Sequence, residues 1–206
     1  MKNFKMKSQN EYIGDDSFTK LLEHYNCPAP LSVIKMRFAG AVCSPNLDLR
    51  PAEVISSFWP EGQSPRLETK NEAELFFKFF MGLWDNIFEK VRQNDIRLSP
   101  VKASSKDELK LLCRLRYEEV EAGYVEGFWG GKKNLKLPAY IAEIIDSLSD
   151  LAGVYGSLVN KLDAVENIDT ALEAVHHTDR MAEKAISFII ENSVLPRIEN
   201  LKRSVN

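Results

Sequence analysis

Hydrophobic positions recur at helical spacing along almost the whole chain. Apolar residues three and four positions apart predict helices over residues 17–25, 31–43, 51–59 and 69–93. Proline and glycine punctuate these stretches, and Pro51 suits a first helical turn because its φ is fixed and it lacks an N–H. No segment alternates between apolar and polar with a period of two. The pattern therefore predicts an all-α fold, a multi-helix bundle.

Two helix starts carry capping boxes. Thr69 and Glu72 form one, and Ser105 and Glu108 form the other. In each box the hydroxyl and the carboxylate are expected to satisfy one free N–H apiece at the helix start. The helix after Thr69 carries a wide apolar face and is the expected centre of the core. The helix after Ser105 is predicted to last to Trp129 and to end at Gly130.

From residue 137 onward the apolar residues follow a heptad pattern, which indicates the seam of a left-handed helix pair. The linker 163–167 is short enough to turn the chain back into an antiparallel helical hairpin. Pro196 is expected to bend or end the second helix of this hairpin, leaving a polar tail over 197–206. The heptad seam, an expected interaction surface, consists of Leu137, Ile141, Ile144, Leu148, Leu151, Tyr155, Leu158 and Leu162.

These elements predict one domain with three parts. Residues 1–14 are expected to be a flexible N-terminus, 15–136 a helical core, and 137–206 a long hairpin packed on that core. A length of 206 residues and a mass of 23.4 kDa suit a single domain. The pattern leaves open whether the hairpin packs within the chain or on a second copy.

Composition narrows the function only slightly. The formal net charge is −3, which gives no reason to expect nucleic acid or an anionic membrane as partner. No run of 18 apolar residues occurs, and the basic N-terminal residues have no apolar stretch behind them, so neither a membrane span nor a secretory signal is expected. Cys27, Cys43 and Cys113 are odd in number and widely spaced, which disfavours disulfides and zinc. A cytoplasmic protein is expected.

Three blocks of sequence resemble the YgfB/YecA-like protein family. Residues 37–53 resemble the family's G-F-L-x-A-L-x-x-x-P … P-S-E-W block, with Arg37 in place of the first Gly. Residues 72–87 are similar to its E-A … L-M-x-x-Y-N-x-I helix, and residues 124–130 to its W-C-x-G-F-x-x-G block. The resemblance implies an all-α fold, often a homodimer, and a largely undefined activity. It assigns structural roles to Phe38, Pro45, Pro51, Gly127 and Phe128. The family's Cys-rich metal-binding tail has no counterpart after Cys113.

One pair of residues is a candidate for metal chemistry. Glu173 and His176 are three positions apart and share a helix face, as ligands in di-iron bundles do. Such sites need a second step of this kind and further carboxylates on facing helices. The sequence does not supply them, so the favoured interpretation is a polar strip on which His176 and Asp179 face water. No metal or other cofactor is expected.

Other catalytic patterns are missing or explained by structure. The chain has no nucleophile elbow, Walker A loop or His-Glu-x-x-His step. The glycines and lysines of 127–133 follow a helix rather than precede one, so a helix cap is favoured over a phosphate loop. The carboxylates Glu118, Glu119, Glu121 and Glu126 could hold an acid–base pair, but a solvated acidic face is favoured.

Charge is distributed unevenly along the chain. Lys102, Lys106, Lys110 and Arg114 fall at four-residue steps and form a basic stripe on one helix. Residues 137–175 contain only Lys161 against seven acidic residues. The stripe lacks the interleaved aromatics of single-strand binders. We expect the asymmetry to guide one surface onto another, within the fold or between protomers.

Taken together, these patterns predict a non-enzymatic cytoplasmic protein that acts through protein–protein contacts. A homodimer is expected, and the sequence does not identify the protein partner. The alternatives are a metal-dependent helical enzyme that uses Glu173 and His176, and a nucleic-acid-binding regulator that uses the basic stripe.

Overall fold

The fold of the described residues is helical throughout, as the hydrophobic pattern predicts. The computed structural model describes residues 11–132, 134–164 and 167–205, and no strand occurs among them. The all-α multi-helix fold class is therefore confirmed. In chain order the elements are α1 (Asp15–His24), α2 (Leu31–Cys43), α3 (Pro51–Ser56), α4 (Lys70–Arg92), α5 (Lys106–Tyr117), the π-helical η1 (Glu118–Val125), α6 (Glu126–Trp129), α7 (Ala139–Lys161), the 3₁₀ turn η2 (Leu162–Ala164), α8 (Ile168–Ile189), the π-helical η3 (Ile190–Val194) and α9 (Leu195–Val205).

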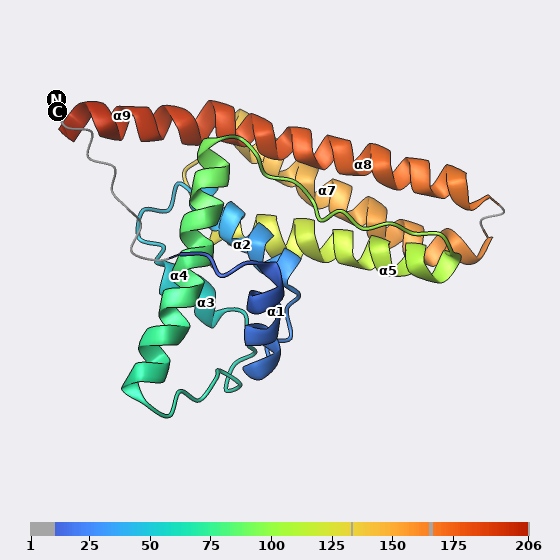
Figure 1. The fold of residues 1–206 in the computed structure, drawn as a ribbon. Helices are drawn as coiled ribbons and strands as arrows, with labels where there is room; N and C mark the ends of the chain where they lie inside the picture. The colour runs from blue at the N-terminus through green and yellow to red at the C-terminus, as the bar shows by residue number, and fades with distance from the viewer. Residues whose placement is uncertain (1–10, 133, 165–166, 206) are drawn as a thin grey trace.

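The helices are arranged around α2. Figure 1 shows α8 and α9 as one long rod, with α7 running beside α8 and the α5–η1–α6 segment running beside α7. Helix α4 crosses these layers steeply, and α1 and α3 lie on its side of the molecule. Helix α2 contacts both η1 and α6 as well as α4. It is thus buried between the N-terminal helices and the α5–α6 segment.

Aromatic side chains fill the core between α1, α2 and α4. The Phe80 ring lies 5.0 Å from the ring of Phe18 and 4.7 Å from that of Phe76. Phe38 on α2 contacts Phe58 at 5.3 Å between centroids. Edge-to-face pairs such as Phe18–Phe80 add about 0.5–1.5 kcal/mol each beyond the burial of their apolar area. The wide apolar face predicted for residues 69–93 therefore packs against side chains from several neighbouring segments.

Both capping boxes form, but in each the carboxylate bonds to the N–H one residue before the cap residue. The Thr69 Oγ1 accepts from the Glu72 N–H at 3.1 Å, and the Ser105 Oγ accepts from the Glu108 N–H at 3.2 Å. The Glu72 carboxylate accepts from the N–H of Glu68, one residue before the cap, at 2.7 Å. The Glu108 carboxylate likewise accepts from the N–H of Ser104, one residue before its cap, at 2.7 Å.

π-helical segments interrupt the regular α-helical pattern at two places in the described chain. The helix predicted to run from Ser105 to Trp129 does extend that far, as α5, η1 and α6, and its middle part is the eight-residue π segment η1. Pro196, expected to bend or end the helix, does not end it, because the chain continues as α9, and the polar tail predicted over 197–206 is helical up to residue 205. The π segment η3 ends immediately before α9 begins. A π turn holds an extra residue, which gives the proline ring the room that an α turn denies it.

Helix α7 packs within the chain, on α5, η1 and α8. The heptad seam divides into two halves there: Ile141, Leu148, Tyr155 and Leu162 are buried, whereas Leu137, Ile144, Leu151 and Leu158 are partly exposed. Ile145 and Ala152 are buried in addition, so the buried stripe is rotated by one residue from the predicted one. Three neighbours on different sides, instead of one partner helix, account for this rotation.

Two predicted features involve undescribed residues. The turn of the C-terminal hairpin includes residues 165 and 166, outside the described part, so the hairpin as a whole stays a prediction. The flexible N-terminus is likewise undescribed up to residue 10. Residues 11–14 lie against α4, because a Cβ at Gly82 would stand 2.6 Å from the carbonyl oxygen of Glu11.

Candidate ligand pocket beside a π-helical segment

Three glycines allow α2 and the η1–α6 segment to approach very closely. A Cβ at Gly40 would lie 2.0 Å from the Tyr124 carbonyl oxygen, and one at Gly127 would lie 2.2 Å from that of Arg37. A Cβ at Gly123 would meet the Met36 Cβ at 2.8 Å. None of these positions admits a larger residue without moving backbone or a core side chain. The crossing fixes η1 and α6 on α2.

The same segment ends in a left-handed cap. Gly130 has φ 54° and ends α6, and Gly131 follows with φ 74°. Glycine adopts this conformation without steric cost, so the helix cap predicted for these glycines is confirmed. The cap turns the chain away from α6 and leaves an opening between α2, α3, α6 and α7.

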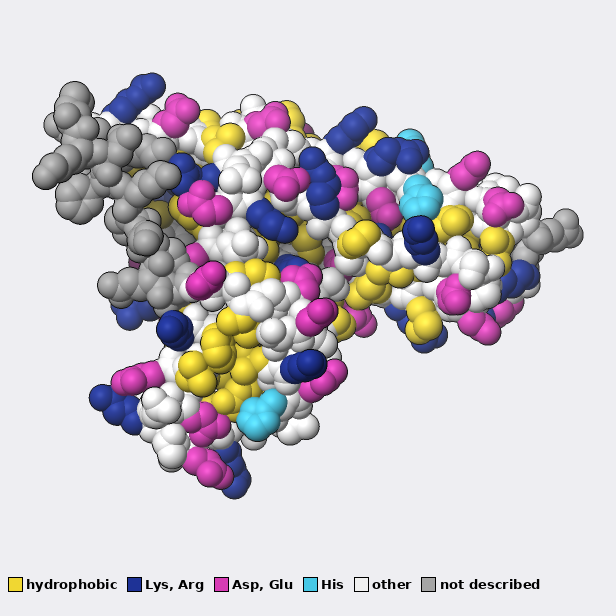
Figure 2. Space-filling view, in the orientation of Figure 1, with side chains coloured by type: hydrophobic (Ala, Val, Ile, Leu, Met, Phe, Trp, Pro, Cys, Tyr) yellow, Lys and Arg dark blue, Asp and Glu magenta, His cyan; other side chains and the backbone are white. Residues whose placement is uncertain are grey.

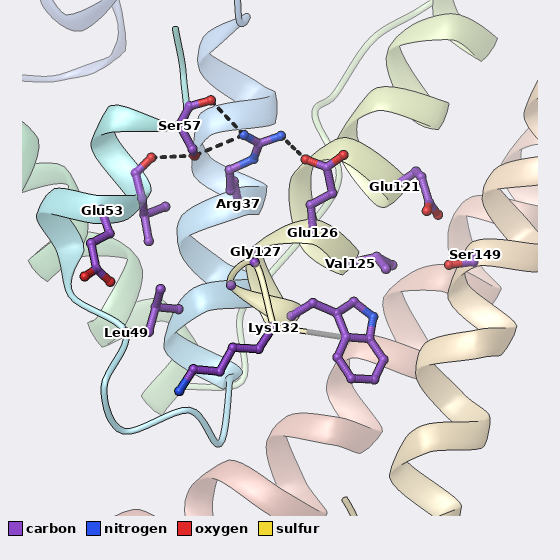
Figure 3. A pocket seen from close by; sticks show the side chains of 14 residues that line it. Arg37, Leu49, Glu53, Ser57, Glu121, Val125, Glu126, Gly127, Lys132 and Ser149 are labelled. Atoms are coloured by element: carbon purple, nitrogen blue, oxygen red, sulfur yellow. Dashed lines mark hydrogen bonds and ion pairs between the residues drawn. The ribbon is translucent and has the colours of Figure 1, made fainter. Parts of the chain in front are cut away.

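This opening is a pocket of about 770 Å³. Its apolar wall is formed by Leu49, Val54, Val125 and Trp129. Figure 3 shows Leu49, Glu53 and Ser57 on one side and Glu121 and Ser149 on the other. Arg37, Glu126 and Lys132 complete the polar part of the lining. A volume of roughly 300–1,000 Å³ with an apolar lining and a few placed polar groups is typical of ligand sites.

Arg37 is the centre of the pocket's hydrogen-bond network. Its Nε donates to the Ala122 carbonyl oxygen at 2.7 Å, and its Nη1 donates to the Ser57 carbonyl and hydroxyl oxygens, each at 3.1 Å. Its Nη2 forms an ion pair with Glu126. Figure 3 shows the bonds from Arg37 to Ser57 and to Glu126, which join the end of α3, α2 and α6. All three guanidinium nitrogens therefore bond to the protein itself.

Two other charged groups at the pocket have partners in neighbouring loops. Lys132 Nζ bonds to Asn46 Oδ1 at 2.9 Å and to Asp48 Oδ2 at 3.1 Å. The Glu53 carboxylate accepts from the Arg50 N–H at 3.2 Å, at the start of α3. These bonds hold the pocket's rim in place.

Glu121 differs from the other charged residues of the lining. Its Oε2 is inaccessible to solvent and has no hydrogen-bond partner within the described part of the chain. The two basic groups of the lining are bound elsewhere, Arg37 to Glu126 and Lys132 to Asp48. The pocket thus contains one carboxylate that the described protein does not compensate.

A second charged cluster lies in the interior, on the other side of η1. Arg116 donates to Asp179 Oδ1 at 3.0 Å and to Glu119 Oε2 at 2.6 Å, and the Tyr155 hydroxyl donates to the same Asp179 oxygen at 2.7 Å. Arg116 also bonds to the Ser99 carbonyl oxygen at 2.7 Å. Burial works against the charge of Arg116, but Glu119 and Asp179 outweigh it and raise the pKa of the guanidinium. This cluster joins α5, η1, α7 and α8.

The interior cluster corrects two sequence predictions. Glu119 was expected on a solvated acidic face, yet it is 0% exposed. Asp179 was expected to face water, yet it is 9% exposed. Both carboxylates are buried because Arg116, also buried, supplies the opposite charge, and the sequence spacing alone does not reveal this third partner.

The candidate metal residues lie at the surface. Glu173 is exposed, and His176, whose side chain is 48% exposed, has its Nδ1 3.7 Å from Asp179 Oδ2. Within residues 11–132, 134–164 and 167–205, no group of three or more His, Cys, Asp and Glu side chains could hold a metal ion. The structure therefore brings no further ligand to Glu173 and His176.

Two residues of the basic stripe contact Asp163, which belongs to the acidic segment of the same chain. Lys110 forms an ion pair with Asp163 at 2.6 Å, and Lys106 Nζ lies 3.5 Å from the Asp163 carbonyl oxygen. Lys102 and Arg114 are exposed. On the face shown in Figure 2, basic and acidic side chains alternate over α8 and α9. The charge asymmetry thus serves, at least through Lys106 and Lys110, to hold α5 against the end of α7.

The five residues to which the family resemblance assigns structural roles lie in the core, at the close contact with α2, or at and before the start of α3. Phe38 and Phe128 are 0% exposed, and Gly127 forms the close contact with α2. Pro51 is the first residue of α3, and Pro45 lies in the loop before it. Gly127 is also the one residue of this set that lines the pocket.

Sequence reasoning missed the pocket itself. Arg37 was noted only as a departure from the family block, Glu121 only as part of an acidic face, and Trp129 only as a helix end. Their signal was the glycine-rich stretch 127–131, whose pattern also indicates a helix cap. Residues 84 positions apart, such as Arg37 and Glu121, meet only through the α2–η1 crossing.

No family model, no curated protein and no solved structure matches this chain. Among the described helices, none has the length and apolarity that a bilayer crossing requires.

Proposed function

We propose that the protein is a non-enzymatic binding protein and that its ligand occupies the pocket beside η1. The observation that carries this proposal is the pocket of about 770 Å³, with apolar walls and with several of its polar groups, Arg37 and Lys132 among them, fixed by internal bonds. Side chains held in place before a ligand arrives lose little freedom on binding, which favours affinity. The geometry thus supports recognition.

The lining offers little for catalysis. Its hydroxyl groups belong to Ser57 and Ser149, and its described residues include no His or Cys. Ser57 donates to the Val54 carbonyl oxygen at 2.7 Å and accepts from Arg37, so no base is positioned to activate it. Burial raises the pKa of the Cys43 thiol to about 12 and that of Cys113 to about 11, so neither is a ready nucleophile.

Protein–protein contact remains part of the proposal, supported by a second feature of the surface. An apolar groove between α2, α4, η3 and α9 includes Leu47, which is 84% exposed, and Leu201, which is 58% exposed. Exposed apolar grooves are typical of contact surfaces. Membership of the YgfB/YecA-like family, a homodimer and a cytoplasmic location stay proposals as well. Light scattering that finds monomers at every concentration would exclude the homodimer.

The two alternatives have less support. A metal-dependent enzyme would need ligands beside Glu173 and His176, and a nucleic-acid binder would need the basic stripe free of Asp163. Elemental analysis of protein purified without chelators tests the first, and binding to nucleic acid at low salt, with its steep salt dependence, tests the second.

The ligand proposal is tested by saturation-transfer NMR on a panel of aromatic and aliphatic fragments of different charge. Ser149→Phe places a ring in the pocket lining, and Ser147→Phe places the same ring on the exposed face of α7. We expect fragment signals with the wild type and with Ser147→Phe, and their loss with Ser149→Phe. Absence of signals from the whole panel, or equal signals with both variants, would exclude the pocket as a ligand site.

A further inference from the structure

The charge balance of the pocket points to the chemistry of its ligand. Among the described residues, the lining holds three carboxylates, Glu53, Glu121 and Glu126, against the two basic groups Arg37 and Lys132. Arg37 is paired with Glu126, and Lys132 is paired with Asp48, outside the lining. Glu53 accepts a backbone N–H at the start of α3. Among the described residues, Glu53 and Glu121 therefore have no cationic partner, and of these two only Glu121 has a buried oxygen, Oε2, without a hydrogen bond.

A carboxylate in this position favours one kind of neighbour. An oxygen removed from water without a hydrogen bond is costly, and the cost is larger when the group is charged. A ligand anion would add repulsion to this cost, and a neutral apolar ligand would displace water from the pocket without supplying a charge. A cation placed against the wall formed by η1 and α7 would compensate Glu121.

The rest of the lining suits the apolar body of such a ligand. Leu49, Val54 and Val125 provide aliphatic surface. Trp129 adds an indole, the aromatic side chain that attracts cations most strongly through its ring face. A ligand with a positive group on an apolar body would therefore use both kinds of wall at once.

We infer that the pocket binds an organic cation, an ammonium group carried on an apolar body, with Glu121 as its counter-ion. This inference rests on the proposed binding function. The ammonium can belong to a free amine or to a lysine side chain of a peptide, because the chemistry at Glu121 is the same.

Three ligands of one shape test the inference: 2-phenylethylamine is a cation, 2-phenylethanol is neutral, and 3-phenylpropionate is an anion. Binding is measured by titration, following the Trp129 indole N–H signal in NMR spectra, assigned with a Trp129→Phe variant. We expect the amine to bind at least about tenfold more tightly than the alcohol, as a hydrogen bond to a charged group implies, and the anion to bind most weakly.

Glu121→Gln removes the charge and keeps the shape of the side chain. We expect it to reduce the affinity for 2-phenylethylamine about tenfold while leaving the affinity for 2-phenylethanol unchanged. Glu118→Gln is the matched control, since Glu118 is exposed on the same segment and does not line the pocket. Its effect on both ligands should be negligible.

A second arm separates the two sources of the ammonium. A short acetylated peptide with a central lysine is compared with the same peptide carrying norleucine. Lysine-dependent binding that competes with 2-phenylethylamine identifies a peptide side chain, and binding of the free amine alone identifies a small molecule.

The failures of the two proposals are distinguishable. If 2-phenylethanol binds as tightly as the amine, or if Glu121→Gln leaves amine binding unchanged, the cation inference is wrong while the binding function stands. If none of the three ligands nor the fragment panel binds, the binding function itself is wrong.

Discussion

Glu119 and Glu121 stand two residues apart on η1 and have opposite surroundings. Glu119 is 0% exposed and accepts from Arg116 at 2.6 Å and from the Ser99 N–H at 3.3 Å. Glu121 lines the pocket, and its Oε2 has no partner among the described residues. Side chains two apart on a helix point to opposite sides, so one segment delivers one carboxylate to the interior and one to the pocket.

The difference separates charge used for stability from charge available for recognition. In the interior cluster each carboxylate has a donor from the same chain, and removing Arg116 leaves Glu119 and Asp179 without a compensating charge. At the pocket the carboxylate lacks such a donor, and compensation can come from a ligand. The same residue type thus has a partner within the described chain at one position and lacks one at the other, and the neighbouring helices determine which.

Arg116→Met should have the largest effect on stability, because it removes the cation of the interior cluster. The variant leaves Glu119 and Asp179 buried without their cation, and we expect it to lower the free energy of unfolding by about 3–5 kcal/mol. Urea unfolding followed by circular dichroism measures the loss. Arg114→Met, at an exposed position of the same helix, is the control and should change stability by less than about 0.5 kcal/mol. A loss at Arg116 as small as that of the control would contradict the role of the interior cluster.

Exchanging each carboxylate for an amide tests the comparison directly. Glu119→Gln weakens a buried charge-assisted hydrogen bond and should cost about 1–3 kcal/mol of unfolding free energy. Glu121→Gln removes an uncompensated charge and should leave stability within about 0.5 kcal/mol of the wild type, or raise it. Thermal and urea unfolding of both variants under identical conditions measures the difference. Equal losses from the two substitutions would show that Glu121 has a partner of comparable strength.

Tyr155→Phe should have a smaller effect on the interior cluster. The phenol donates to Asp179 at 2.7 Å, and both burial and this bond raise the pKa of the Tyr155 hydroxyl. Removing the hydroxyl leaves Asp179 bonded to Arg116, so we expect a loss of about 0.5–1.5 kcal/mol in urea unfolding. In the Arg116→Met background, the same substitution should cost a different amount, because the two donors share one oxygen. Strict additivity would show that they act independently.

The ion pair between Lys35 and the exposed Asp15 provides a reference for the stability changes expected in both regions. Hydrogen bonds from Lys35 and Tyr12 lower the pKa of Asp15. A carboxyl whose pKa is lower in the folded state stabilises the fold above its unfolded-state pKa, and this contribution disappears as the pH falls through the folded-state pKa. We therefore expect Asp15→Asn to cost less than about 1 kcal/mol at neutral pH, and the cost to vanish in acid. Unfolding measured from pH 7 to about pH 3 tests this. A cost that persists in acid would come from packing instead.

Helix starts and the helical core were predictable because their causes are local. The bounds predicted for α2 agree with the structure, and Thr69 and Ser105 cap α4 and α5 as expected. These features depend on residues within one or two turns of each other. The π segment η1 was not predictable in this way, since the extra residue per turn is retained through packing against α2, α5 and α7.

The candidate site was predictable only in its parts. The glycines at 127, 130 and 131 were visible, and so were the carboxylates around Glu121, but nothing in their spacing placed them next to Arg37 or Ser149. Glu119 was assigned to a solvated face because the sequence does not show that Arg116, Ser99 and the α8 residue Asp179 converge around η1.

The sequence by itself determined that the chain forms helices, where most of them begin, and which broad faces are apolar, because these properties follow from capping residues, proline and hydrophobic periodicity within each segment. Tertiary structure alone decided which side of α7 is buried, that Pro196 lies within a continuing helix, and which of two neighbouring carboxylates is compensated. Those outcomes depend on charges and backbones brought together from distant parts of the chain, and the free energy of a buried charge is set by such neighbours.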